Sequence, residues 1–222
     1  TAEYNISERT VEELTELRDD AVEREEYELA QQLTNELNNR SKSTETKKGV
    51  SEVFKENPEL SEIGTEQQYS EYLDNVFPDS KVKDVVYHGT ITKFEKFGDD
   101  QHFGTKQQAN LRAATVADSS PDGIGYDSIE IHGAIINVKS LKRTEDVGFD
   151  WSSVINLAKK EGKDGLVYHN KGENYKNETG DFFHKDDSYV VFNKDNTHIL
   201  GSKKDIEGFK KFTSNFTSPT MS

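Results

Sequence analysis

The sequence contains no cysteine and no run of 18 apolar residues. The first absence excludes disulfide bonds, thiolate-zinc sites and a cysteine nucleophile. The second argues against a membrane-spanning helix, so we expect no membrane partner and a cytoplasmic location. The first residues also lack the basic and apolar regions of a signal peptide. The chain does not begin with methionine, which is typical of a processed or excised piece of a longer protein.

Apolar residues are scarce. They make up 32% of the 222 residues, and the mean hydropathy is −0.89. A chain of this length has room for one medium domain and an appendage. With so few apolar side chains, part of the chain is expected to stand outside a compact core.

The negative charge is concentrated in the first third of the chain. Residues 1–80 hold 21 acidic and 8 basic residues, a net charge of −13, whereas residues 81–222 hold 21 and 20, a net charge of −1. Binding to nucleic acid needs a concentrated basic face, so a nucleic-acid partner is not expected. The nearly neutral second part does not repel an anionic dinucleotide.

Residues 11–40 have the composition of a helix, without glycine or proline. Thr10 and Glu13 have the spacing of a capping box. Apolar residues recur every three or four positions, but the interval from Ala21 to Tyr27 breaks this rhythm. The pattern predicts a helix, a tight polar turn and a returning helix.

The segment 17–30, followed by Leu33, Glu36 and Leu37, resembles the UVR motif, a helical hairpin of excision-repair proteins. Those hairpins bind other proteins, so the resemblance implies a protein partner for a separate unit at residues 1–45. A solvated hairpin, or one long helix without a partner, is the alternative interpretation.

Residues 46–80 are expected to form a helical connector. Residues 41–49 are polar and unpatterned, as in a linker, and two short helices are predicted at 50–55 and 66–76. Their apolar face predicts that they pack on the following domain.

From Lys81 the pattern changes to short β runs separated by turns. Strands are predicted at 82–87, 134–138, 165–168, 189–193 and 197–200, and helices at 106–117, 151–161 and 203–212. Loops are predicted at 118–127 and 171–185. The sequence therefore predicts an α+β domain at residues 81–222, ending in a short helix and preceded by a helical extension.

The first candidate motif is the apolar run from Val85, which is predicted to end in His88 and Gly89, followed by Thr90. A strand-borne histidine next to glycine places a polar side chain beside a bare backbone. A planar carboxamide can approach such a backbone and exchange hydrogen bonds with it. A histidine at the end of a strand can also be an ordinary polar residue with its hydrogen bonds satisfied.

Two further motifs follow. His102, Phe103 and Gly104 come fourteen residues after the first motif and directly precede a predicted helix. The imidazole of His102 is a flat ring that can stack on another ring and form hydrogen bonds. The third motif is the run Asp186–Asn193, an apolar strand that begins with two aspartates and Ser188.

Together the three motifs resemble the NAD-binding core of ADP-ribosyltransferases of the His-Tyr-Glu class, which includes poly(ADP-ribose) polymerases. The similarity spans roughly residues 82–202. The segments 94–97 and 199–209 are similar to transferase domains in the large polyvalent proteins of bacteriophages, which are injected with the genome. The resemblance implies a split β-sheet core that binds NAD between its two half-sheets.

The resemblance also implies roles for single residues. His88 would bond a ribose hydroxyl, and the backbone of Gly89 would hold the nicotinamide amide. His102 takes the position of the family tyrosine that stacks on nicotinamide. The NAD-binding set is completed by Thr90, Phe103 and Gly104.

Ser188 stands where the family carries its catalytic glutamate. A hydroxyl keeps a hydrogen bond but cannot stabilise the positive charge that develops as the glycosidic bond breaks, a loss on the order of a hundred-fold in rate. In a regular strand Asp186 shares a face with Ser188, whereas Asp187 points to the opposite face. His88, Ser188 and Asp186 are therefore the candidate catalytic residues.

The function expected from the resemblance is NAD-dependent mono-ADP-ribosyl transfer to a host protein, by a phage-encoded enzyme that takes part in host takeover in the host cytoplasm and is delivered with the virion. The alternatives are a silenced transferase fold used as a binding or virion-structural module, and an NAD glycohydrolase. No histidine spacing indicates a metal site.

Overall fold

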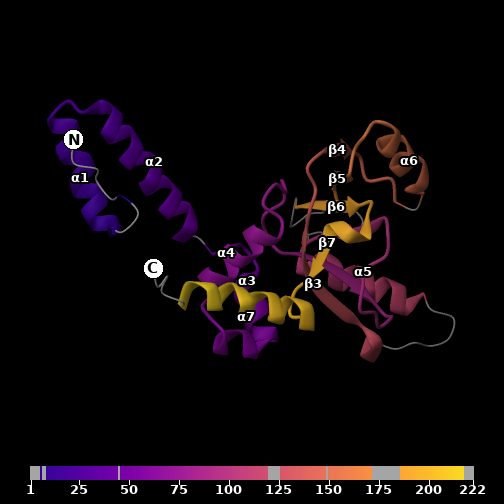
Figure 1. Ribbon diagram of the computed structural model, residues 1–222. Coiled ribbons are helices and arrows are strands. Elements are labelled where there is room, and N and C mark those ends of the chain that lie inside the picture. The colour runs from indigo at the N-terminus through magenta and orange to yellow at the C-terminus, as the bar shows by residue number, and fades with distance from the viewer. Residues whose placement is uncertain are drawn as a thin grey trace, which may run out of the picture. The chain divides into compact units, whose positions relative to one another are not determined.

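The computed structural model describes residues 6, 9–44, 46–119, 126–148, 150–171 and 186–217. The chain divides into two compact units, Thr1–Thr46 and Lys47–Ser222 (Figure 1). The second unit combines helices with two β-sheets, so the fold is α+β. Among the described residues, no helix is long and apolar enough to cross a membrane.

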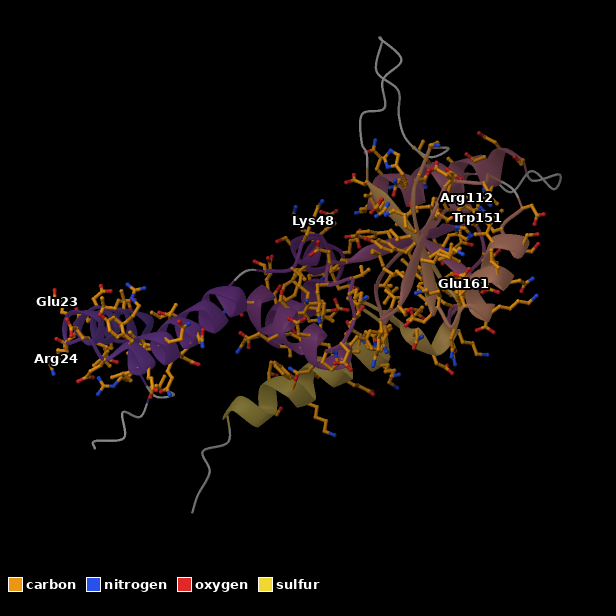
Figure 2. The ribbon with its side chains drawn as sticks, turned by 90° about the horizontal axis from the view of Figure 1, so that it is seen from above. Glu23, Arg24, Lys48, Arg112, Trp151 and Glu161 are labelled. Atoms are coloured by element: carbon orange, nitrogen blue, oxygen red, sulfur yellow. The ribbon has the colours of Figure 1, made fainter. Side chains whose placement is uncertain are left out.

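The first unit is a hairpin of α1 (Val11–Glu23) and α2 (Tyr27–Thr44). Thr10 and Glu13 form the capping box that begins α1. Three residues, 24–26, separate the helices, and Figure 2 labels Arg24 there. The hairpin has an apolar core of its own, made of Leu14, Ala21, Ala30 and Leu33.

The second unit begins with a helical layer. It contains α3 (Val50–Glu56), a 3-10 helix (Pro58–Glu62), α4 (Glu66–Val76) and the C-terminal α7 (Lys203–Thr217). In Figure 1 the labelled helices of this layer gather at one end of the unit. Their buried side chains form one core cluster with residues of the sheet region, including Val85, Tyr87, Ala109 and Ile135. The connector thus packs on the domain that follows it.

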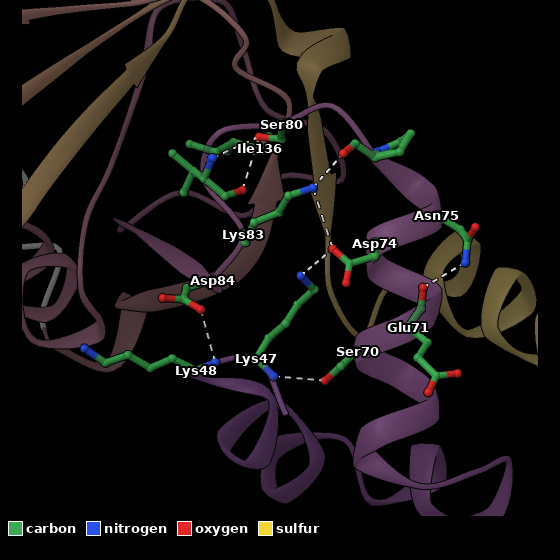
Figure 3. Close-up of polar contacts among 12 residues, drawn as sticks. Lys47, Lys48, Ser70, Glu71, Asp74, Asn75, Ser80, Lys83, Asp84 and Ile136 are labelled. Atoms are coloured by element: carbon green, nitrogen blue, oxygen red, sulfur yellow. Dashed lines mark hydrogen bonds and ion pairs between the residues drawn. The ribbon is translucent and has the colours of Figure 1, made fainter. Parts of the chain in front are cut away.

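Polar contacts join the start of this unit to α4 and to the segment before the first strand (Figure 3). The ammonium group of Lys47 lies 2.7 Å from Asp74, and its main-chain N–H donates to the hydroxyl of Ser70. The main-chain N–H of Lys48 donates to Asp84. These contacts fix the direction in which the chain enters the unit.

The strands form two sheets. The three-stranded sheet has the order β1-β3-β7, with β1 (Val86–Thr90), β3 (Glu130–Ile136) and β7 (Thr197–Ile199). The four-stranded sheet has the order β2-β6-β5-β4, with β2 (Gln101–Phe103), β6 (Asp187–Val191), β5 (Gly165–His169) and β4 (Leu141–Thr144). All named pairs are antiparallel except β4 with β5, which are parallel.

Two helices cover the sheets. α5 (Lys106–Asp118) packs on β1 and β3, and α6 (Ser152–Lys160) packs on β5. A capping box of Thr105 and Gln108 begins α5. Ile155 and Ala158 of α6 join a core cluster with β5 and β6. Figure 1 shows α6 beside these strands.

The predicted position of the first strand was wrong. The strand was expected at 82–87 with His88 at its end, but β1 begins at Val86, and His88 and Gly89 lie inside it. The residues before β1 instead bond elsewhere: Lys81 donates to Val138, and Val85 donates to Lys48. His88 pairs with His132 of β3, so the strand continues through the polar residues.

Other boundaries also differ. β6 covers 187–191 instead of the predicted 189–193, because Asn193 caps a 3-10 helix that follows it. β3 begins at Glu130, four residues before the predicted strand, and β4 was not predicted. α7 runs to Thr217, beyond the predicted end at 212. Most of the two predicted loops, residues 120–125 and 172–185, lies outside the described residues.

Candidate functional site

Among the residues that the structure describes, one main-chain bridge joins the two sheets. The N–H of Tyr87 in β1 donates to the carbonyl of Gly104 at 2.8 Å, and the N–H of Gly104 donates back at 2.9 Å. Gly104 directly follows β2, so the bridge brings the first two sequence motifs together. The third motif joins them through β6, which pairs with β2 along residues 101–103.

Beyond this bridge the pairing of β1 with β2 stops. In an antiparallel ladder the N–H and C=O groups of every second residue point to the same edge. The N–H and the C=O of Tyr87 both point at Gly104. The N–H and the C=O of Gly89, two residues later, therefore point to the same edge of β1, opposite His102. We call this place, bounded by the main chains of Gly89 and His102, the β1–β2 fork.

The side chain of His88 occupies part of the fork. Its Nδ1 atom lies 2.8 Å from the carbonyl oxygen of His102, so Nδ1 carries the proton and donates. In a continued ladder the carbonyl of His102 would accept from the N–H of Gly89, whereas here it accepts from the His88 side chain. Burial lowers the pKa of His88, so the ring is neutral at pH 7 and its Nε2 is an acceptor.

Aromatic rings surround His88. Its ring centre lies 5.9 Å from that of Phe94, 5.5 Å from Phe97 and 5.9 Å from Phe103. Phe94 in turn lies 4.4 Å from the ring of His132. This packing holds the imidazole in one orientation, which a polar contact with a ligand requires.

Gly89 is a glycine because α5 approaches it closely. A Cβ atom at this position would collide with the main-chain oxygen of Ala109 in α5. One face of β1 is therefore covered by the helix at the fork. Thr90, the last residue of β1, uses its hydroxyl to accept from the N–H of Thr92 and pairs with Glu130.

The ring of His102 projects from the face of β2 opposite to Phe103. It lies edge-on to Trp151, with 5.0 Å between the ring centres, and its Nδ1 lies 3.1 Å from the hydroxyl of Tyr168. Burial and, next, the charge of Arg112 lower the pKa of His102 to about 4. His102 is thus a neutral ring held in an aromatic cluster.

Ser188 is buried, with 1% of its surface exposed. Its hydroxyl donates to Oε1 of Gln108 at 3.1 Å and accepts from Nδ2 of Asn170 at 3.0 Å. It shares a face of the four-stranded sheet with His102, because Val190 pairs with His102 and lies two residues after Ser188. The ring of His88 lies instead beside Phe97 and Phe103, and Phe103 projects from the face of β2 opposite to His102.

Asp186 does not belong to the strand that was expected to place it beside Ser188, because β6 begins at Asp187. The carbonyl of Asp186 accepts from the Gln108 side chain at 3.4 Å. Asp186 lines a cleft of about 790 Å³ together with Tyr87, Gly104 and Lys106. This cleft opens on the side of the bridge where β1 begins, and the fork lies on the other side.

The cleft is electrically balanced. Its charged lining residues are Lys48, Lys81, Lys83 and Lys106, against Glu52, Asp84, Asp186 and Asp187. Lys106 is already paired with Glu52 at 2.6 Å and also with Glu56. None of the described residues His88, Gly89, His102 and Ser188 is among its lining residues.

The sequence motifs did not include several residues that shape the site. Gln108 joins the α5 cap to Ser188, and the Thr105–Gln108 capping-box spacing could have indicated its orientation. Tyr168 and Trp151 hold the His102 ring. Asn170 lies eighteen residues from Ser188, and no local pattern marks their contact.

Within the ranges that the structure describes, no group of three metal-ligating side chains is present. Comparison of the chain with family models, curated proteins and solved structures gave no match. The site therefore has to be interpreted from its own geometry.

Proposed function

We propose that the second unit has an ADP-ribosyltransferase-like core, binds NAD with its nicotinamide at the β1–β2 fork, and transfers ADP-ribose to a protein of a phage host. One observation carries the proposal: among the described residues the two sheets meet at one main-chain bridge, beyond which the main chains of Gly89 and His102 face each other without a main-chain hydrogen bond between them. The resemblance of the three sequence motifs to the transferases supports the same reading and points to action in the host cytoplasm after delivery with the virion.

The main chain of Gly89 suits the amide of nicotinamide. A carboxamide has an NH₂ donor and a carbonyl acceptor in one plane, and a strand edge offers one acceptor and one donor. In the described part of the chain no main-chain hydrogen bond joins the N–H of Gly89 to the His102 carbonyl, and that oxygen accepts from His88 instead. A ligand amide would replace the missing ladder hydrogen bonds.

His88 suits a ribose hydroxyl. Its Nδ1 is committed to the carbonyl of His102, and its pKa is lowered by burial. The neutral ring therefore offers Nε2 as an acceptor for an O–H group. Protonation would turn this acceptor into a donor, so binding through Nε2 needs the neutral form.

The chemical step breaks the bond between the ribose C1′ and the nicotinamide nitrogen, and the bonding electrons leave with nicotinamide. A nucleophile of the acceptor protein then bonds to C1′ and loses its proton. Ser188 provides a hydroxyl where a carboxylate would stabilise the positive ribose. The proposal therefore implies slow turnover.

The test has a binding arm and a chemical arm. Calorimetry should detect NAD binding to the wild-type chain. His88→Ala should weaken it about ten-fold, through loss of a polar contact to the ligand. His169→Ala, a change at a half-buried histidine of β5, is the matched control and should leave binding unchanged.

In the chemical arm, labelled NAD is incubated with the protein and host lysate. Label on a lysate protein supports the transferase, and label only in free ADP-ribose supports a glycohydrolase. A wild-type chain that binds no NAD at millimolar concentration would overturn the proposed function.

A binding or virion-structural module without turnover is the second candidate. The burial of Ser188 favours it, because both hydrogen bonds of the hydroxyl are made within the protein. Ser188→Glu distinguishes the two: a carboxylate at this position should raise NAD consumption if β6 faces the reacting ribose. If neither Ser188→Glu nor Asp186→Asn changes NAD consumption, the catalytic assignment of β6 is wrong.

A further inference from the structure

Helix α5 passes over both sides of the bridge. Gln108 contacts Ser188, and a Cβ on Gly104 would collide with the Gln108 side chain. The main chain of Ala109 lies against Gly89. The first two turns of α5 therefore face the strands that form the fork.

Arg112 lies one turn further along this face of α5. It follows Ala109 by three residues and Gln108 by four, and residues at these spacings share one side of a helix. Unlike them, Arg112 is exposed. Figure 2 labels it on α5. Arg112 is thus placed at the solvent side of the fork.

The histidines on both strands respond to the charge of Arg112. After burial, Arg112 is the largest charge effect that lowers the pKa of His102, and it also lowers the pKa of His88. The charge of Arg112 therefore acts on one residue of each strand that bounds the fork.

The charge of Arg112 is not neutralised within the described part of the chain, since no ion pair or hydrogen bond joins it to another described residue. By contrast, three other arginines, Arg18, Arg24 and Arg143, pair with carboxylates. The acidic groups that act on His102, Asp100 and Asp146, have other partners: Asp100 pairs with Lys159, and Asp146 accepts main-chain N–H groups.

We propose that Arg112 binds the diphosphate of the dinucleotide whose nicotinamide lies at the fork. The inference rests on the proposed function and identifies its anionic subsite. A guanidinium presents parallel N–H donors that match two phosphate oxygens, and it remains charged at every physiological pH. Three residues of helix separate Arg112 from Ala109 by about 4.5 Å along the axis, the order of size of one ribose ring.

The experiment measures three ligands against three proteins by calorimetry. The ligands are NAD, nicotinamide riboside, which has no phosphate, and ADP, which has no nicotinamide. The proteins are wild type, Arg112→Gln and Lys160→Gln. The last variant removes one positive charge from an exposed position on α6 and controls for net charge.

Arg112→Gln should weaken binding of NAD and ADP at least ten-fold, since it loses charge-assisted hydrogen bonds. It should leave nicotinamide riboside unchanged, and Lys160→Gln should match wild type for all three ligands. Equal binding of NAD by wild type and Arg112→Gln would overturn the inference and leave the proposed function standing.

Failure of the proposed function can also be distinguished from failure of the inference about Arg112. If wild type binds neither NAD nor nicotinamide riboside, the proposed function fails, and ADP decides the subsite. ADP binding that Arg112→Gln abolishes would keep Arg112 as an anion site, and absence of ADP binding would overturn it.

Discussion

Two buried polar clusters in the second unit differ in charge. The first surrounds Asp205 of α7, which is completely buried and accepts hydrogen bonds from Tyr69 of α4, His198 of β7 and the main chain of Gly201. The second surrounds Ser188 of β6 and is neutral, with Gln108 and Asn170 as partners.

The difference separates a structural cluster from the cluster at which we propose chemistry. A buried carboxylate is tolerated when several donors from different elements satisfy it. Burial and, next, the Asp205 carboxylate raise the pKa of Tyr69, so its hydroxyl stays protonated and donates. The cluster at Asp205 thus joins the helices α4 and α7 to strand β7. At Ser188, where the proposed reaction would benefit from a carboxylate, the protein has a neutral group.

The largest expected effect is at the charged cluster. Asp205→Ala should lower the free energy of unfolding by about 3–5 kcal/mol, because it leaves two buried side-chain donors and a half-buried main-chain N–H without their acceptor. Urea denaturation followed by circular dichroism measures this loss. Asp79→Ala, which removes an exposed carboxylate paired with Lys139, should have a much smaller effect, because solvent screens this ion pair. Equal losses for the two variants would contradict the structural role of Asp205.

The neutral ring of His102, on the same sheet face as Ser188, predicts that the stability of the fold is sensitive to acid. The pKa of His102 is 6.5 in the unfolded chain and about 4 in the folded one, so between these values the unfolded state binds more protons. Stability should therefore be complete above pH 6.5 and fall as the pH is lowered toward 4. The shift sets an upper bound of about 3 kcal/mol, which solvent at this half-buried ring reduces.

His102→Gln should flatten this dependence, and His169→Gln should not. Denaturation curves collected from pH 4 to pH 8 provide the measurement. An unchanged slope in the His102 variant would show that other groups control the acid sensitivity. The lowered pKa of His88 acts in the same direction, so some slope should remain.

Removal of the neutral hydroxyl should have a smaller effect. Ser188→Ala should cost about 1–2 kcal/mol, because Asn170 loses an acceptor and Gln108 loses a donor. Ser119→Ala, which removes an exposed hydroxyl at the end of α5, should change stability by less than about 0.5 kcal/mol. A Ser188 variant as stable as wild type would show that its hydrogen bonds are not needed for the fold.

The smallest effect on stability is expected for a change outside both polar clusters. Deletion of residues 1–46 removes the hairpin, whose buried core consists of its own side chains only. The melting temperature of the remaining chain should change by no more than about 2 °C. A drop of about 10 °C would show that the hairpin stabilises the second unit.

The elements predicted correctly from the sequence are those that a pattern of neighbouring residues indicates. The interval from Ala21 to Tyr27 indicated the hairpin turn, and the helix after Thr105 begins where it was expected. β4 was missed because its side chains are mostly half-buried and it has no alternation of apolar and polar residues. The first half of β3 was missed because it is polar; its His132 packs against the ring of Phe94, which no pattern in the strand itself reveals.

The candidate site was predictable only in part. The bridge of Tyr87 and Gly104 brings the first two motifs side by side, and the roles assigned to His88, Gly89 and His102 stay predictions. The burial of Ser188 depends on Gln108 and Asn170, which are 80 and 18 residues away in the chain. Whether a side chain faces solvent or a buried partner is decided by such distant contacts, and a single sequence does not contain them.

The only tryptophan of the chain, Trp151, lies against the His102 ring, and its ring centre is 4.5 Å from that of Tyr168. Its indole N–H donates to the carbonyl of Gly148, so the ring is held in place. Tryptophan fluorescence therefore has one emitter, and that emitter contacts a residue of the fork. A ligand that moves His102 would change the emission of the unlabelled protein, which gives the chain a built-in optical sensor for its own ligands.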